Sequence, residues 1–192
     1  MRLFNSVGPN PRVVTLFLAE KGITLPHVTV DIRGGENRRA PYIDAVNPAG
    51  QTPALELDNG SIVTEITAIC EYLEERHPSP PLIGTTAEER AETRMWVRRA
   101  DLKVCEPLTA GFRGAEGLPM FEQRTRCLPE AADAQIAGRQ YIAGDRFTLA
   151  DIMLFAFLDF GRAVGQPFAP ENRHVAAWFD RVSKRPAFQP DT

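Results

Sequence analysis

Hydrophobic and polar positions in the first 76 residues alternate between strand-like and helix-like spacing. Arg2–Asn5 and Leu25–Ile32 have the composition of strands, and Ala40–Val46 that of a short helix. Between the two strands, Pro11–Lys21 carries a broad apolar face and ends at Gly22, a residue that commonly terminates helices. This face consists of Val13, Val14, Leu16, Phe17 and Leu18.

The stretch from Asn47 to Leu73 predicts a hairpin followed by a helix. Thr52–Leu57 alternates like a strand, Asp58-Asn59-Gly60 predicts a tight turn, and Ser61-Ile62-Val63 is the returning strand. A helix then opens at Thr64-Glu65, with an apolar stripe of Ile66, Ile69, Cys70 and Leu73. The order β-α-β-α-β-β-α is that of a thioredoxin-like α/β domain.

The pattern changes after residue 76, where a proline-rich stretch cannot continue a helix. We expect a thioredoxin-like domain over 1–76, a linker over 77–85 and an all-helical domain over 86–192. In the last we expect a long helix, Glu88–Val104, stopped by Glu106-Pro107, and a final helix, Arg173–Ser183. Further expected features are a glycine-rich bend over Phe112–Pro119, partial helix over Glu122–Asp133 and a Thr148-x-x-Asp151 capping box that opens another helix.

Charge and composition exclude several classes of function. The net charge of -3 gives no general attraction to nucleic acid or to an anionic membrane, and no long apolar span or signal-like start is seen. The three histidines, His27, His77 and His174, lack metal-ligand spacing, so we expect no metal. The three cysteines, Cys70, Cys105 and Cys127, form no CxxC and predict reduced thiols in a cytoplasmic protein.

Pro53 is the informative residue of the hairpin. It begins a strand that should be buried, where proline lacks a ladder donor, so we expect a cis Thr52–Pro53 bond. Such a bond would leave the backbone of Thr52 free to pair with an extended peptide. The helix that starts near Glu65 presents free N–H groups that suit a carboxylate. The hairpin therefore predicts a site for a small anionic peptide.

GQTPALELDNG followed by TEITAICEYL resembles the glutathione-binding half of the cytosolic glutathione S-transferases. The similarity covers nearly the whole chain and is greatest to bacterial and fungal members, including the fungal Gtt2-like group. It implies a detoxification enzyme that uses glutathione as co-substrate and conjugates its thiolate to a small hydrophobic electrophile. It also implies a cytoplasmic homodimer, without nucleic-acid or membrane partners. The alternatives are a non-catalytic glutathione transferase-like binding or interaction module, and other glutathione-dependent thiol chemistry.

The resemblance also implies which residues bind glutathione. Glu65 would bind the α-amino group of the γ-glutamyl moiety. Alternatively, it is an acid at a helix start that stabilises the helix by its interaction with the dipole. The family usually has Ser next; here Ile66 offers only its backbone N–H, and Thr67 could add a hydroxyl. Arg38 and Arg39 could clamp the glycine carboxylate, with Arg39 favoured, or form a solvated loop. Thr52 contributes backbone groups, as positioned by Pro53.

The position of the catalytic residue departs from the family pattern. Asn5 stands where relatives have Tyr, and Asn10 and Pro11 where others have Ser or Cys, which leaves Ser6 as the only hydroxyl in the loop. Asn10 is interpreted as the helix N-cap, as an N–H donor to the thiolate, or both. We expect the helix dipole, Ser6, Asn10 and the nearest backbone donors, Arg12 and Val13, to activate the thiol together. Thiol–disulfide exchange is disfavoured because this loop contains no cysteine.

The helical half offers a second-substrate pocket, or simply an ordinary helical core. The candidate residues share apolar character and are Leu102, Cys105, Leu108, Phe112 and Phe121. Cys70 is interpreted as a core residue, and Arg98 and Arg99 as surface residues. Relatives have a long helix before Ala137, so we expect the chain to be shortened or interrupted between Glu130 and Gln140.

Overall fold

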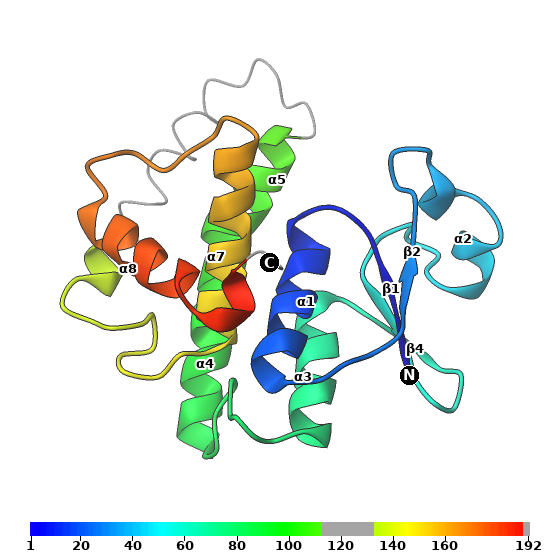
Figure 1. Ribbon diagram of the computed structural model, residues 1–192, viewed down its shortest axis with the longest axis horizontal. Coiled ribbons are helices and arrows are strands. Elements are labelled where there is room, and N and C mark those ends of the chain that lie inside the picture. Colours follow the sequence, from blue (N-terminus) through cyan, green and yellow to red (C-terminus); the bar gives the residue numbers. More distant parts are fainter. Residues whose placement is uncertain (113–132, 190–192) are drawn as a thin grey trace. The chain divides into compact units, whose positions relative to one another are not determined.

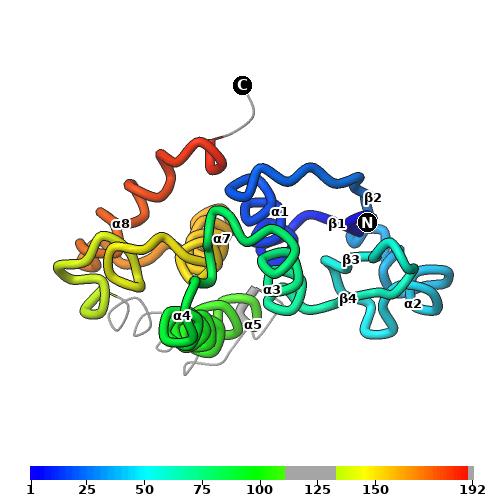
Figure 2. The backbone as a smooth tube through the Cα atoms, turned by 90° about the horizontal axis from the view of Figure 1, so that it is seen from below, coloured from blue at the N-terminus to red at the C-terminus, as the bar shows by residue number. Residues whose placement is uncertain are grey.

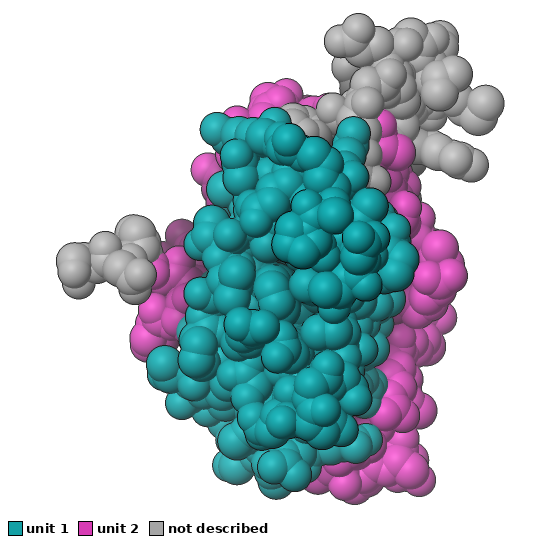
Figure 3. Space-filling model, turned by 90° about the vertical axis from the view of Figure 1, so that its right-hand side faces the viewer, with its two compact units in different colours: residues 1–80 teal, residues 81–192 magenta. Residues whose placement is uncertain are grey.

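The computed structural model describes residues 1–112 and 133–189, without the side chain of Phe112. The chain forms two compact units, Met1–Pro80 and Pro81–Thr192, which are coloured separately in Figure 3. Each unit has its own buried core, so each is described by itself.

Unit 1 is built on a four-stranded mixed sheet in the order β2-β1-β3-β4. Strand β1 (Arg2–Asn5) lies parallel to β2 (His27–Thr29) and antiparallel to β3 (Ala54–Glu56), which pairs antiparallel with β4 (Ile62–Thr64). Helix α1 (Pro9–Lys21) connects β1 to β2, a short α2 (Tyr42–Ala45) precedes β3, and α3 (Ile66–Arg76) follows β4. The predicted thioredoxin-like order is confirmed.

Helices α1 and α3 lie on one face of the sheet and α2 on the other, as Figures 1 and 2 show. Successive side chains of β1 point to opposite sides of the sheet, so this strand contributes buried residues to both faces. Phe4 packs with Val30, Tyr42 and Ala54 in a core cluster of buried residues. On the helical side, fully buried residues from α1 and α3 include Val13, Val14, Phe17, Ile69, Cys70 and Leu73. Cys70 is therefore a core residue, as predicted.

Two local features of unit 1 differ from the sequence prediction. Helix α1 begins at Pro9 with Gly8 as N-cap, so the interpretation of Asn10 as N-cap is wrong. Proline fits the first helical position because its missing N–H would have no intrahelical partner there, and Gly8 tolerates its φ of 126°. In the hairpin only Gly60 has positive φ, at 83°, since the turn spans three residues and needs one left-handed position.

Unit 2 opens with α4 (Ala87–Ala100), a π-helical turn (Asp101–Cys105) and α5 (Glu106–Phe112). The predicted stop at Glu106-Pro107 is wrong, because the helical path continues through Pro107. In the π turn, the N–H of Glu106 donates to the carbonyl of Asp101, five residues back. This wider turn accommodates a proline, which cannot donate and whose ring would crowd the carbonyl four residues earlier in an α-helix.

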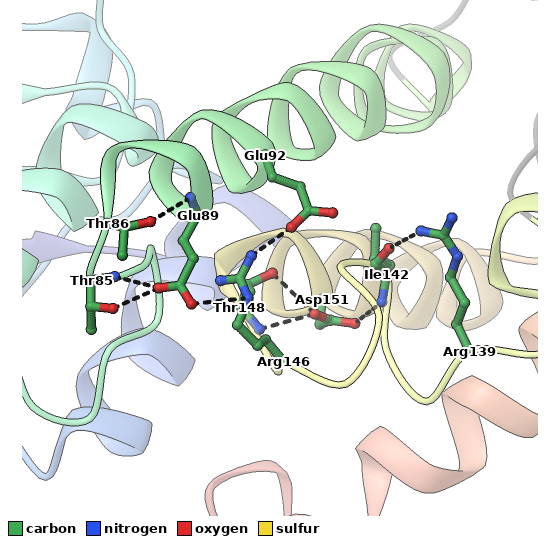
Figure 4. Close-up of polar contacts among 9 residues, drawn as sticks. All are labelled: Thr85, Thr86, Glu89, Glu92, Arg139, Ile142, Arg146, Thr148 and Asp151. Atoms are coloured by element: carbon green, nitrogen blue, oxygen red, sulfur yellow. Dashed lines mark hydrogen bonds and ion pairs between the residues drawn. The ribbon is translucent and has the colours of Figure 1, made fainter.

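The predicted helices α7 (Leu149–Ala163) and α8 (Arg173–Ser183) are present. The capping box is confirmed: Asp151 accepts from the N–H and hydroxyl of Thr148 at 3.0 and 3.1 Å. Its carboxylate also accepts from the Ile142 N–H at 3.0 Å, as Figure 4 shows. The Trp178 indole N–H donates to the same carboxylate at 2.9 Å. Asp151 therefore joins the start of α7 to the preceding loop and to α8.

Several predictions fall wholly or partly outside the described residues. They are the bend over 112–119, the helix over 122–133, and the side chains of Phe112, Phe121 and Cys127. Of the segment from Glu130 to Gln140, the part from Asp133 onward is described. It contains one helical turn, in which Ala137 N–H donates to Asp133 O at 3.0 Å.

Candidate functional site

Strand register brings the predicted site residues of unit 1 to one edge of the sheet. Phe4 pairs with Ala54, so Ser6, two residues on, comes opposite Thr52. Ala54 in turn pairs with Thr64, which brings Glu65, the next residue, beside Pro53. Three segments far apart in sequence therefore end together at this edge.

The Thr52–Pro53 peptide bond is cis, as predicted, and Pro53 is buried. Within the described residues, no hydrogen bond is made by the backbone N–H or C=O of Thr52. Its hydroxyl lies 2.5 Å from the Ser6 hydroxyl. The backbone of Thr52 thus has an unused donor and acceptor at the end of β3, the groups that pair with an added extended peptide.

The loop before Thr52 is fixed by residues that the sequence analysis did not single out. Gln51 O accepts from the Tyr42 hydroxyl at 2.6 Å and from the Asn47 amide at 2.9 Å. Gly50 O accepts from the Asn37 amide at 2.5 Å, and Gly50 itself has φ of 63°. Asn47, which precedes Pro48 and caps its own turn by accepting from Ala49 N–H, is a turn signal that could have been recognised.

Glu65 is the N-cap of α3 and has φ of 68°, the one positive value among the described non-glycine residues. A glutamate with positive φ is uncommon and costs on the order of 1–3 kcal/mol, a strain that is often found at functional sites. The first intrahelical bond is Ile69 N–H to Glu65 O at 3.0 Å. The N–H groups of Ile66, Thr67 and Ala68 have no partner within the described part of the chain and can receive an anion.

The first turn of α1 offers fewer backbone donors than the sequence suggested. Pro9 and Pro11 have no N–H, and Arg12 N–H donates to Gly8 O at 3.3 Å. Val13 lies in the following turn, where the helix ladder takes its N–H. The prediction that Arg12 and Val13 are the nearest free donors is therefore wrong, and the N–H of Asn10 replaces them.

Ser6 and Asn5 both lie beside this turn. The half-buried Ser6 hydroxyl contacts Thr52 and, more distantly, the carbonyl of Val7 at 3.3 Å. Asn5 Oδ1 is buried and has no hydrogen-bond partner within the described residues. No Tyr or Cys is present in this loop, so its polar side chains can offer amide and hydroxyl groups to a ligand.

Arg38 and Arg39 are both exposed, next to the loop that carries Gly50. The Arg39 guanidinium bends back to donate to the carbonyls of Gly34 and Gly35, the latter at 3.2 Å. No contact is found for the Arg38 side chain within the described residues, so it can reach a ligand without breaking an existing bond.

The second-substrate candidates of unit 2 fall into different environments. Cys105 and Leu108 are buried, and Leu108 packs against Gly161 of α7. Leu102 is 52% exposed. Burial raises the pKa of the Cys105 thiol well above its usual range, which makes this group unreactive at neutral pH. Arg98 and Arg99 are exposed, as predicted.

The geometry agrees with the comparison to known proteins. A profile of the glutathione S-transferase N-terminal domain matches residues 7–76, and one of the C-terminal domain matches 119–186. Glutathione S-transferase 2 of Saccharomyces cerevisiae is 33% identical over 94% of this chain and 84% of its own length. A maleylacetoacetate isomerase of Pseudomonas aeruginosa is 41% identical over 93% and 92% of the two chains.

Among solved structures, Gtt2 from Saccharomyces cerevisiae superimposes with a TM-score of 0.91 at 28% identity, over 98% of each chain. The sequence similarity spans both units, and the fold is the same thioredoxin-like plus helical arrangement of elements. This chain therefore belongs to the glutathione S-transferase family and has its fold, which supports glutathione transferase activity at the level of the family.

Proposed function

We propose that glutathione binds along the sheet edge formed by Ser6, Thr52 and Glu65. The unused N–H and C=O of Thr52 support this most strongly, because they can pair with the cysteinyl backbone of the tripeptide. The γ-glutamyl carboxylate then meets the free N–H groups at the start of α3, and Glu65 receives the α-amino group. Arg38 and Arg39 bind the glycine carboxylate.

In this arrangement the cysteinyl sulfur lies near Asn10 and the start of α1. The thiolate attacks the electrophile, a C–S bond forms, and the leaving group departs with the bonding electrons or the electrophile takes up a proton. An unperturbed thiol is only a few per cent thiolate at neutral pH, because its pKa is about 8.5. A helix terminus contributes at most about 2 kcal/mol, or somewhat more than one pKa unit, so turnover is modest.

Calorimetric titration with glutathione tests the binding site. Glu65→Ala and Arg38→Ala should each weaken binding, because the first removes the partner of the α-amino group and the second a partner of the glycine carboxylate. Glu75→Ala, an exposed acid near the other end of α3, and Arg76→Ala are matched controls that should bind like the wild type. Absence of wild-type binding at millimolar glutathione would refute the proposal.

A panel of electrophiles then identifies the reaction. It should contain aryl halides, unsaturated carbonyls and maleylacetoacetate, the last because of the isomerase relative. The second candidate is a binding module without turnover, favoured by the absence of Tyr and Cys in the loop after β1 and by Ile66 in place of Ser. Conjugation above the uncatalysed rate that is lost in Glu65→Ala would reject that alternative.

The proposal extends to assembly and location. We infer a homodimer that works in the cytoplasm. Met95 and Leu102 are apolar side chains of the α4–π segment that are 40% and 52% exposed, and a partner subunit could cover them. Light scattering at micromolar concentration should give the mass of a dimer.

The inferred location is supported by the cysteines. Cys70 and Cys105 are free thiols, which is usual in a reducing compartment. None of the described helices is long and apolar enough to cross a membrane.

A further inference from the structure

We propose that Ser6 is a positioning residue: its hydroxyl fixes the Thr52 backbone for peptide pairing and does not activate the thiol. This inference rests on the proposed glutathione site. The two hydroxyl oxygens are 2.5 Å apart and partly buried, and they join segments 46 residues apart in sequence. This separation is at the short end of the range for O–H···O hydrogen bonds.

The pair is the one hydrogen bond of Thr52 within the described residues. The loop before it is held through Gln51 and Gly50, and the strand after it begins at Ala54. In the described part of the chain, Ser6 is thus the one residue that holds Thr52 by a hydrogen bond, and the Thr52 backbone must keep the right orientation for a ligand. A group that holds a binding backbone in place raises affinity by reducing the freedom lost on binding.

The single proton of the Ser6 hydroxyl separates a positioning role from a catalytic one. A hydroxyl has one proton to donate, and Ser6 already has two protein acceptors for it, Thr52 Oγ1 and Val7 O. If Ser6 donates to Thr52, it has no proton for a thiolate. If Thr52 donates to Ser6, the Ser6 proton is directed to the Val7 carbonyl. The donor to sulfur is then the amide of Asn10, either backbone or side chain.

Substitutions on both sides of the contact test the idea with matched controls. Ser6→Ala and Thr52→Val each remove the bond, whereas Thr52→Ser keeps the hydroxyl. We expect the first two to raise the Kd and KM for glutathione by roughly three- to tenfold, with kcat at saturating glutathione within about twofold of wild type. The double variant should be no worse than either single one, because both changes remove the same bond. Thr52→Ser should bind like the wild type.

The pKa of the bound thiol, followed by the ultraviolet absorbance of the thiolate, separates the two roles. It should be the same in Ser6→Ala and in wild type. A raised thiol pKa and a lower kcat in Ser6→Ala, with Thr52→Val unaffected, would overturn the inference and make Ser6 catalytic. Unchanged affinity in both variants, with normal binding by the wild type, would also overturn it.

Backbone mobility in the ligand-free protein tests the same contact without glutathione. Amide hydrogen exchange is not informative for the Thr52 N–H itself, which has no hydrogen bond in the described residues, so nitrogen-15 relaxation is measured instead. The order parameter of this N–H should be lower in Ser6→Ala and Thr52→Val than in wild type, and unchanged in Thr52→Ser. Equal order parameters in all variants would overturn the positioning role. Failure of the wild type to bind glutathione would instead refute the proposed function, so the two failures are distinguishable. Thermal melting confirms that each variant is folded.

Discussion

The ammonium of Lys21 forms an ion pair with the carboxylate of Glu74 inside unit 1, where the two side chains are 0% and 1% exposed. Lys21 also donates to His77 O at 2.7 Å and to Pro80 O at 2.6 Å. One side chain at the end of α1 therefore satisfies a buried acid of α3 and two carbonyls of the segment that follows α3. A buried pair of this kind has a large cost when only one partner is removed.

Lys21→Met should lower the free energy of unfolding by roughly 3–5 kcal/mol, because the buried carboxylate of Glu74 loses the ammonium of its ion pair. The double variant Lys21→Met with Glu74→Leu should recover part of this loss. Urea unfolding measures both. Lys184→Ala is the control: its ion pair with Asp180 is 70% and 64% exposed, and the change should cost less than about 1 kcal/mol. A single Lys21 variant as stable as wild type would contradict the assignment.

Asp151→Ala should be among the most destabilising substitutions in unit 2. Four donors point at its carboxylate, from Thr148, Ile142 and Trp178, and all would lose their acceptor. At about 1–3 kcal/mol for each buried unsatisfied donor, several kcal/mol of stability are lost. Asp145→Ala, at an exposed position in the preceding loop, should be close to neutral. Thermal melting and tryptophan fluorescence follow the effect, and equal melting temperatures for the two variants would disprove it.

Tyr42 should make the free energy of unfolding depend on pH in the alkaline range. Two causes raise the pKa of its phenol from 10.0 to about 12: burial is the larger, and the negative charge of Glu36 is the smaller. The unfolded chain releases this proton near pH 10 and the folded chain near pH 12, so the folded state binds more protons between them. The free energy of unfolding therefore falls as pH rises through this window, by roughly 2–3 kcal/mol from this group.

Tyr42→Phe isolates that effect because it removes the titrating group. At about pH 9 the variant should be less stable than wild type by about 1 kcal/mol, from loss of the bond to Gln51 O. By about pH 11 the difference should shrink or reverse. Urea unfolding at several pH values checks this, and a constant difference across the range would show that the phenol titrates normally in the folded protein.

Asn10 is expected to make a limited contribution to the rate. Asn10→Ala keeps the backbone N–H and the helix dipole, so kcat should fall by about tenfold or less. Asn10→Asp places a negative charge beside the thiolate and should raise the pKa of the bound thiol. Asn59→Asp, in the exposed hairpin turn, is the charge-matched control and should leave that pKa unchanged. Complete loss of turnover in Asn10→Ala, with glutathione still bound, would identify Asn10 as the essential catalytic residue.

Local chemistry in the sequence determined most elements of unit 1 and the capped helices of unit 2. Gly22 ends α1 with φ of 65°, and Thr148 with Asp151 opens α7, because these positions depend on backbone conformation and on side chains three residues apart. The cis bond before Pro53 was also predicted, because proline lacks the N–H that a buried strand would use and X–Pro bonds are the ones that adopt the cis form. These features are set by neighbours in sequence, so the sequence contains them.

Tertiary structure decided the features that depend on distant partners. Local patterns did not predict three of them: the start of α1 at Pro9 instead of Pro11, the continuation of the helical path through Pro107, and the burial of Lys21. The Ser6–Thr52 contact depends on the register of β1 against β3, and that register is set by which faces are buried in the whole sheet. The sequence by itself therefore determined the elements and the family of this protein. Only the packed sheet decided which hydroxyl, amide and carbonyl groups meet at its edge, because hydrogen bonds between segments form only where packing brings them within about 3 Å.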